Sequence, residues 1–99
     1  FNTTLGVVAT NAALTRPQAG KLAQMAQNGL VKMIRPIHST FDGDVVFALS
    51  TGEARADLNV LGAMAEEAVR EAVRRAVFQA DGLGRLPTAR TIREGTWKN

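Results

Sequence analysis

Two short apolar runs in the chain predict β-strands. The first spans 3–10 (TTLGVVAT) and the second spans 45–50 (VVFALS), and both are rich in the β-branched types that favour strands. Their apolar cores are continuous rather than alternating, which indicates burial on both faces. Gly6 interrupts the first run and indicates the close approach of another backbone. Thr51 and Gly52 are expected to end the second strand.

A segment between these two runs shows helical periodicity, with apolar residues recurring at intervals of three and four. Thr15 and Gln18 have the spacing of a capping box, and Pro17 suits a first helical turn. We therefore expect a helix over 15–34, ended by Pro36.

A second helix is predicted over 58–80, with Asp57 or Asn59 as its N-terminal cap. Its apolar stripe consists mostly of alanine and valine, and such small side chains let a helix lie close to a sheet or to another helix. The glycine-rich stretch 81–87 breaks this helix. We expect residues 81–99 to form an extended C-terminal arm that lies on another part of the protein.

The predicted order of elements is strand, helix, loop, strand, helix and tail, which describes an α/β chain. Its 99 residues suffice for one small domain, so we expect a single unit over 1–99. Two strands do not form a stable sheet by themselves. The chain is therefore expected to be one part of a larger sheet, completed by a partner polypeptide or by an upstream region.

Composition and charge exclude several classes of protein. The chain has no cysteine, so it has no disulfide scaffold, thiolate metal site or cysteine nucleophile. The net charge of +3 is scattered over the sequence, whereas a nucleic-acid-binding protein is expected to gather basic residues on one face. No apolar stretch approaches the ~20 residues that span a bilayer. We expect no nucleic-acid or membrane partner, and a cytoplasmic location, with a periplasmic one as the alternative.

Thr3 suggests chemistry beyond strand formation. If the chain is cut after Asn2, Thr3 gains a free α-amine, whose unperturbed pKa is about 7.7–8.0. That amine can accept the proton of the Thr3 hydroxyl, so one residue supplies both nucleophile and base. On residue type alone, however, Thr3 and Thr4 are better explained as strand-forming residues.

The loop before the second strand (RPIHSTFDGD) contains the other candidate groups. Asp42 and Asp44 flank Gly43, so in an extended stretch both carboxylates point the same way. Near Thr3 they would titrate as a coupled pair, one holding the amine and the other relaying a proton. An Asp-Gly turn and a divalent-cation site are alternatives, although two carboxylates are few for a metal. A triad with His38 is a further alternative, which only geometry can establish.

Three stretches in combination resemble the β subunit of the L-aminopeptidase/D-esterase family, which includes β-peptidyl aminopeptidases and nylon-oligomer hydrolases. They are NTTLGVVATNAALT at 2–15, IRPIHSTFDGD at 34–44 and VVFALSTG at 45–52. The resemblance is strong through Gly52 and extends to the second half only in pattern. Two motifs, NTT followed by VVAT and FDGD about forty residues later, are specific in combination, and either alone would be weak.

The resemblance implies a precursor that cuts itself into an α and a β chain. It implies a four-layer αββα sandwich like that of N-terminal nucleophile hydrolases. This chain is expected to supply part of the sheets and two helices of that sandwich. The implied partner is an α subunit from the same precursor, and the αβ units are expected to form a higher oligomer. By position, Thr3 is the nucleophile, the cut lies between Asn2 and Thr3, and Asp42 and Asp44 are the polar pair around it. No cofactor or metal is implied.

The implied activity is hydrolysis of amide bonds in short peptides, amino-acid amides or ω-amino-acid oligomers. Many aminopeptidases of this family carry Ser and Glu where this chain has Asp42 and Asp44, and the Asp–Asp form is more similar to the nylon-oligomer hydrolases. Alternatives are an acyltransferase of the ornithine acetyltransferase type and a non-catalytic interaction subunit. Phe1 and Asn2 precede Thr3, and while Asn2 is attached the nitrogen of Thr3 is an amide that cannot act as a base. We expect this form to be inactive until it is cut.

Overall fold

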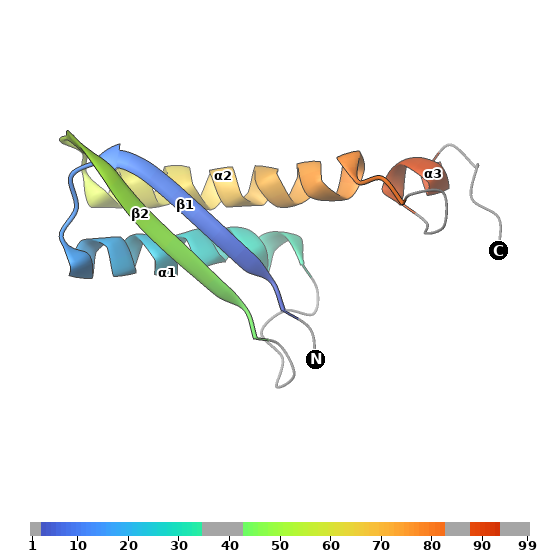
Figure 1. The fold of residues 1–99 in the computed structure, drawn as a ribbon, viewed down its shortest axis with the longest axis horizontal. Coiled ribbons are helices and arrows are strands. Elements are labelled where there is room, and N and C mark those ends of the chain that lie inside the picture. The colour runs from blue at the N-terminus through green and yellow to red at the C-terminus, as the bar shows by residue number, and fades with distance from the viewer. Residues whose placement is uncertain (1–2, 35–42, 83–87, 94–99) are drawn as a thin grey trace.

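A computed structural model describes residues 3–34, 43–82 and 88–93 of the chain. Two parallel strands form a ribbon, and two long helices lie together against one of its faces (Figure 1). In chain order the elements are β1 (Leu5–Ala12), α1 (Arg16–Met33), β2 (Val45–Ala54), α2 (Leu58–Gln79) and α3 (Ala89–Arg93). The α/β class and the alternating order of strands and helices predicted from the sequence are confirmed.

Among the described residues, no helix or strand covers one face of the two-stranded sheet. Side chains alternate along β1, and those on the side away from the helices are largely open to solvent: Leu5 is 69% and Val7 63% exposed. On β2, Phe47 is 56% and Leu49 51% exposed. Both long helices pack on the same side, so the described part of the chain buries one face of the sheet, and burial of the other face stays a prediction. We call the side that carries Leu5, Val7, Phe47 and Leu49 the bare face.

β2 continues to Ala54, past Thr51 and Gly52, which the sequence pattern placed at its end. A slip in the ladder after Thr10 accommodates the extra residues. The predicted end was wrong because the pattern reports apolar residues, whereas this part of the strand is held by polar ones.

Two hydroxyl groups hold the end of β2 against β1. Ser50 Oγ donates a hydrogen bond to the carbonyl oxygen of Ala12 (2.6 Å) and accepts one from the N–H of Leu14 (3.1 Å). Thr51 Oγ1 donates to the carbonyl oxygen of Thr10 (3.2 Å). These bonds replace ladder contacts that the slip in register removes, so the pairing persists beyond the apolar run.

The predicted capping signals are confirmed at the start of both long helices. The N–H of Gln18 donates to Thr15 Oγ1 (3.3 Å), and Gln18 Oε1 accepts from the N–H of Thr15 (2.9 Å). Before α2 the cap is Asp57, whose Oδ1 accepts from the N–H groups of Asn59 (2.8 Å) and Val60 (3.2 Å). Of the two candidates, Asp57 therefore caps this helix and Asn59 lies inside it.

α1 and α2 pack closely because small residues lie between them. Gly29 of α1 faces the backbone of α2, where a Cβ on residue 29 would lie 2.9 Å from the nitrogen of Arg70 and would overlap the carbonyl oxygen of Glu66. Lys32 also forms an ion pair with Glu66 across this contact. The close packing expected from the small-residue stripe of α2 is thus confirmed, with a glycine on the opposite helix making it possible.

The core lies between the two helices and the sheet. Its buried apolar residues come from α1, β2 and α2, and they are Leu22, Ala26, Leu30, Val46, Ala65 and Val69. Most of these side chains are small or of medium size, so this interior is a thin layer. That thinness agrees with the absence of a second layer on the bare face.

Arginine side chains from α2 and from the short helix α3 lie close to the ring of Phe78, near the end of α2. The guanidinium groups of Arg74 and Arg93 lie 5.9 and 5.7 Å from the ring centre of Phe78. Arg74 also donates hydrogen bonds to Glu71 and, together with a smaller effect of Arg75, lowers the pKa of that carboxyl group to about 2. The Glu71–Arg74 pair is solvent-exposed, so it contributes little to stability.

The region 81–99, predicted to be an extended arm, contains the helical turn α3 (Ala89–Arg93). Residues 83–87 and 94–99 lie outside the described residues, so the arm as a whole stays a prediction. In the part of the chain that the structure describes, no helix has the length and apolarity needed to cross a membrane.

Candidate functional site

The candidate site lies where β1 and β2 both begin. The strands are parallel, and the ladder pairs each residue with the one 40 positions later, from Leu5 with Val45 to Thr10 with Ser50. The two residues that precede Leu5 therefore lie beside the two that precede Val45. Parallel pairing in register thus brings Thr3 and Thr4 next to the end of the FDGD loop.

Two hydrogen bonds hold the backbone of Thr4. The N–H of Thr4 donates to Asp44 Oδ1 (2.8 Å), and its carbonyl oxygen accepts from the N–H of Val45 (3.0 Å). The first of these groups belongs to the peptide bond between Thr3 and Thr4. A bond from an amide to a carboxylate is among the stronger kinds. Asp44 therefore fixes the position of the residue that bears the candidate nucleophile.

The hydroxyl of Thr3 lies over Gly43. The side chain of Thr3 is exposed, and a Cβ placed on residue 43 would lie 3.3 Å from Thr3 Oγ1. The alternation of exposed and half-buried residues along β1 already starts at Thr3, where Thr3 is exposed and Thr4 half-buried. Thr3 therefore shares the bare face with Leu5 and Val7, and Thr4 is turned toward the helices.

Of the predicted site residues, the structure describes Thr3 and Asp44, and it joins Asp44 to the N–H of Thr4, the residue after Thr3. The carboxylate of Asp44 is bound to the amide that follows Thr3, and its predicted contact with the amine of Thr3 stays a prediction. Asn2, His38 and Asp42 lie outside the described residues. Among residues 3–34, 43–82 and 88–93, no cluster of three or more acidic or histidine side chains could hold a metal ion.

The role of Asp44 can be tested through stability. Asp44→Ala should lower the free energy of unfolding by about 1–3 kcal/mol, because a hydrogen bond to a charged acceptor is lost. Asp44→Asn keeps an oxygen in place and should lose less. Chemical denaturation of the full-length protein measures both changes, with Glu53→Ala as a control on the same strand. If Asp44→Ala unfolds at the same denaturant concentration as Glu53→Ala, the bond to Thr4 contributes nothing.

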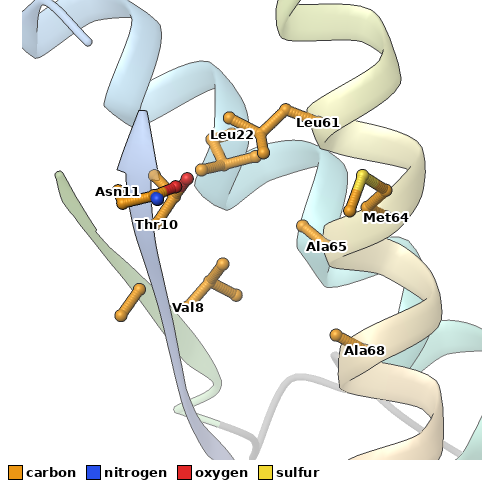
Figure 2. A pocket seen from close by; sticks show the side chains of 9 residues that line it. Val8, Thr10, Asn11, Leu22, Leu61, Met64, Ala65 and Ala68 are labelled. Atoms are coloured by element: carbon orange, nitrogen blue, oxygen red, sulfur yellow. The ribbon is translucent and has the colours of Figure 1, made fainter. Parts of the chain in front are cut away.

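A groove runs along β1 beneath α2, and we call it the β1–α2 groove. It consists of three adjoining hollows of about 400, 160 and 310 Å³, which share lining residues from one to the next. The first hollow begins at Thr4. Figure 2 shows the far end, where Val8 of β1 faces Ala65 and Ala68 of α2 across the hollow, with Leu22 of α1 beside it. Within the described part of the chain, β1 pairs with β2 alone, so its other edge borders this groove.

Two residues of the site were not recognised from the sequence. The sequence pattern explains Thr4 only as a strand-forming residue, and Gly43 only as the spacer between two carboxylates. A signal was present, since TT and GD each precede an apolar run directly. Parallel pairing of those runs without a shift would have placed Thr3 opposite Gly43 and Thr4 opposite Asp44.

Comparison with known proteins identifies the family of the chain. The profile of peptidase family S58 matches residues 1–88. This match confirms the resemblance to the L-aminopeptidase/D-esterase family.

Three relatives illustrate the range of the match. An uncharacterised aminopeptidase of Mycobacterium leprae is 41% identical over 89% of this chain and 28% of its own length. An uncharacterised aminopeptidase of Mycobacterium tuberculosis is 34% identical over 98% of this chain and 33% of its own length. The 6-aminohexanoate-oligomer endohydrolase of Paenarthrobacter ureafaciens is 31% identical over 73% of this chain and 24% of its own length. The chain therefore spans a third or less of the relatives that it matches.

Proposed function

Because this chain belongs to peptidase family S58, we propose that it supplies the nucleophile of an amide-bond hydrolase, and that the nucleophile is Thr3. One observation carries the proposal. Thr3 is exposed just before β1 begins, and the backbone of the next residue, Thr4, is held by Asp44 and Val45. Such anchoring holds a reacting oxygen in place without blocking access to it.

The first step is cleavage of the chain itself. Thr3 Oγ1 attacks the carbonyl carbon of Asn2, and the peptide bond becomes an ester as the nitrogen of Thr3 takes up a proton. Water then hydrolyses the ester, which leaves a carboxylate on Asn2 and a free α-amine on Thr3. The amine produced in this way is the base that the mature enzyme needs.

Turnover repeats the same chemistry on a substrate. The Thr3 amine accepts the hydroxyl proton as Oγ1 attacks the substrate carbonyl, and that proton passes to the departing amine. An ester links the acyl group to Thr3 until water releases it as an acid. Asp44 holds the Thr3–Thr4 peptide bond throughout, and Asp42 is proposed to stand beside the amine.

The proposed substrates are short peptides, amino-acid amides and ω-amino-acid oligomers. Two kinds of relative support this range: those named aminopeptidase, and those named 6-aminohexanoate-oligomer endohydrolase. Both names describe the hydrolysis of an amide bond, whether at a chain end or inside an oligomer. Amide hydrolysis is thus the part of the proposal that both of these names support.

We further propose that the rest of the same precursor, as an α subunit, covers the two open surfaces of this chain. The relatives are at least three times as long as the part matched here, so a precursor of that length contains enough further polypeptide for an α subunit. A strand in the β1–α2 groove would pair with the open edge of β1, and a second sheet would cover the bare face. Those additions would produce the four-layer αββα sandwich. Because Thr3 belongs to the bare face, the substrate pocket and the oxyanion donors would come from the part of the α subunit that covers that face.

The mass of the small chain in the active enzyme tests the proposal. After expression of the full-length precursor, intact-protein mass spectrometry should find a small chain that begins at Thr3. Its appearance should coincide with the rise of p-nitroanilide or amide hydrolysis. An active enzyme whose small chain retains Phe1 and Asn2 would rule out Thr3 as an N-terminal nucleophile.

A further inference from the structure

We propose that Gly43 is a positioning residue for the reaction assigned to Thr3, an inference that rests on the proposed function. The absence of a side chain at residue 43 leaves the space beside Thr3 Oγ1 open. The hydroxyl can then keep the orientation that attack requires, and a substrate carbonyl can approach it along the sheet surface.

The distance between the two residues supports this role. A Cβ at residue 43 would lie 3.3 Å from Thr3 Oγ1, closer than most contacts that a Cβ makes, so the hydroxyl would shift by a few tenths of an ångström. Threonine is β-branched and stiff about χ1, and it therefore relieves such a contact poorly by rotation. The shift would fall on the reacting atom itself.

The backbone does not require glycine at this position. The φ angle of Gly43 lies outside the left-handed region, so an L side chain can be accommodated there without backbone strain. Glycine also leaves a more flexible unfolded chain than other residues do. Local stability therefore gives no reason for glycine here, whereas the open space beside the hydroxyl gives one.

The ladder on the bare face places side chains opposite one another over most of its length. From Leu5 to Ala9, the residues of β1 on that face stand opposite residues with side chains: Leu5 opposite Val45, Val7 opposite Phe47, and Ala9 opposite Leu49. Thr3 lies beside Gly43, which has none, and at the other end of the strand the backbone of Asn11 packs against Gly52. The sheet therefore has a notch on its bare face, and the notch adjoins the candidate nucleophile.

The test compares Gly43→Ala and Gly43→Val with wild type in the full-length precursor. Gly43→Ala should melt at the wild-type temperature or above it. Its kcat for amide hydrolysis and its rate of self-cleavage should both fall on the order of tenfold, because a small misplacement of the nucleophile slows attack. KM should change little, and Gly43→Val should lose more activity than Gly43→Ala.

Gly6→Ala is the matched control. A Cβ at residue 6 would lie 3.3 Å from Val46 Cγ2, which is an equally tight contact on the same strand as Thr3 but against an apolar side chain. This variant should keep its turnover within about twofold of wild type, since the reacting atom does not move.

A rescue experiment separates a steric effect on the hydroxyl from a general disturbance. Serine has no γ-methyl group and does not hold its hydroxyl in one χ1 orientation, so less of the orientation that Gly43 preserves remains to be lost. Gly43→Ala should therefore cost less activity in a Thr3→Ser background than in wild type, and the two substitutions should be non-additive. Additive losses would contradict the proposed contact.

The outcomes distinguish this inference from the proposed function. If hydrolysis depends on Thr3 but Gly43→Ala turns over at the wild-type rate, the role of Gly43 is overturned and the proposed function stands. If Gly43→Ala loses activity together with its melting temperature, glycine is needed for folding and the inference is likewise overturned. If Thr3→Ala hydrolyses substrate normally, the proposed function fails, and the inference fails with it.

Discussion

Thr3→Ala is expected to abolish both self-cleavage and amide hydrolysis when it is made in the full-length precursor. Loss of a nucleophile typically lowers kcat on the order of 10⁴-fold or more, because the other groups of a site cannot form the covalent intermediate. The precursor should remain a single chain on a denaturing gel. Thr3→Ser retains a hydroxyl on the same atom position and should retain measurable cleavage and turnover.

Thr4→Ala is the matched control for this experiment. It removes the neighbouring hydroxyl and leaves the N–H and carbonyl oxygen of residue 4, which bind Asp44 and Val45. Its cleavage and turnover should therefore stay close to wild type. Wild-type rates for Thr3→Ala, or an equal loss for Thr4→Ala, would show that the Thr3 hydroxyl is not the nucleophile.

Gly29→Ala is expected to destabilise the fold by about 1–3 kcal/mol, which is the usual range for overpacking a tight interior. The new methyl group would lie 2.9 Å from both the nitrogen of Arg70 and the Cβ of Val69, and it would overlap the carbonyl oxygen of Glu66. Most of these atoms belong to the backbone of α2, so they can yield only if the two helices move apart. The free energy of unfolding from chemical denaturation of the full-length protein measures the loss.

Gly20→Ala, in the same helix, should instead raise the free energy of unfolding. No atom lies within 4 Å of a Cβ at that position, and alanine is about 0.8–1 kcal/mol more favourable than glycine inside a helix. Comparing the two variants separates helix propensity from packing. Equal stability of Gly29→Ala and Gly20→Ala would mean that the two helices are not in close contact at residue 29.

The sequence by itself determined the features that depend on neighbouring residues in the chain. The capping box of Thr15 and Gln18, and the cap at Asp57, involve groups two or three positions apart, so local pattern is enough to predict them. The resemblance around Thr3 and the FDGD segment was also visible, because both motifs are continuous in the sequence.

Only the tertiary structure decided the contacts between segments that lie far apart. The hydroxyls of Ser50 and Thr51 extend β2 by bonding to β1, which the apolar pattern could not indicate. The pairing of Asp44 with the amide of Thr4 and the open space that Gly43 leaves beside Thr3 both depend on a register across 40 residues. That register is set by the parallel packing of the two strands beneath the helices. Periodicity within one strand indicates which of its residues share a face. It does not indicate which residues of the neighbouring strand stand opposite.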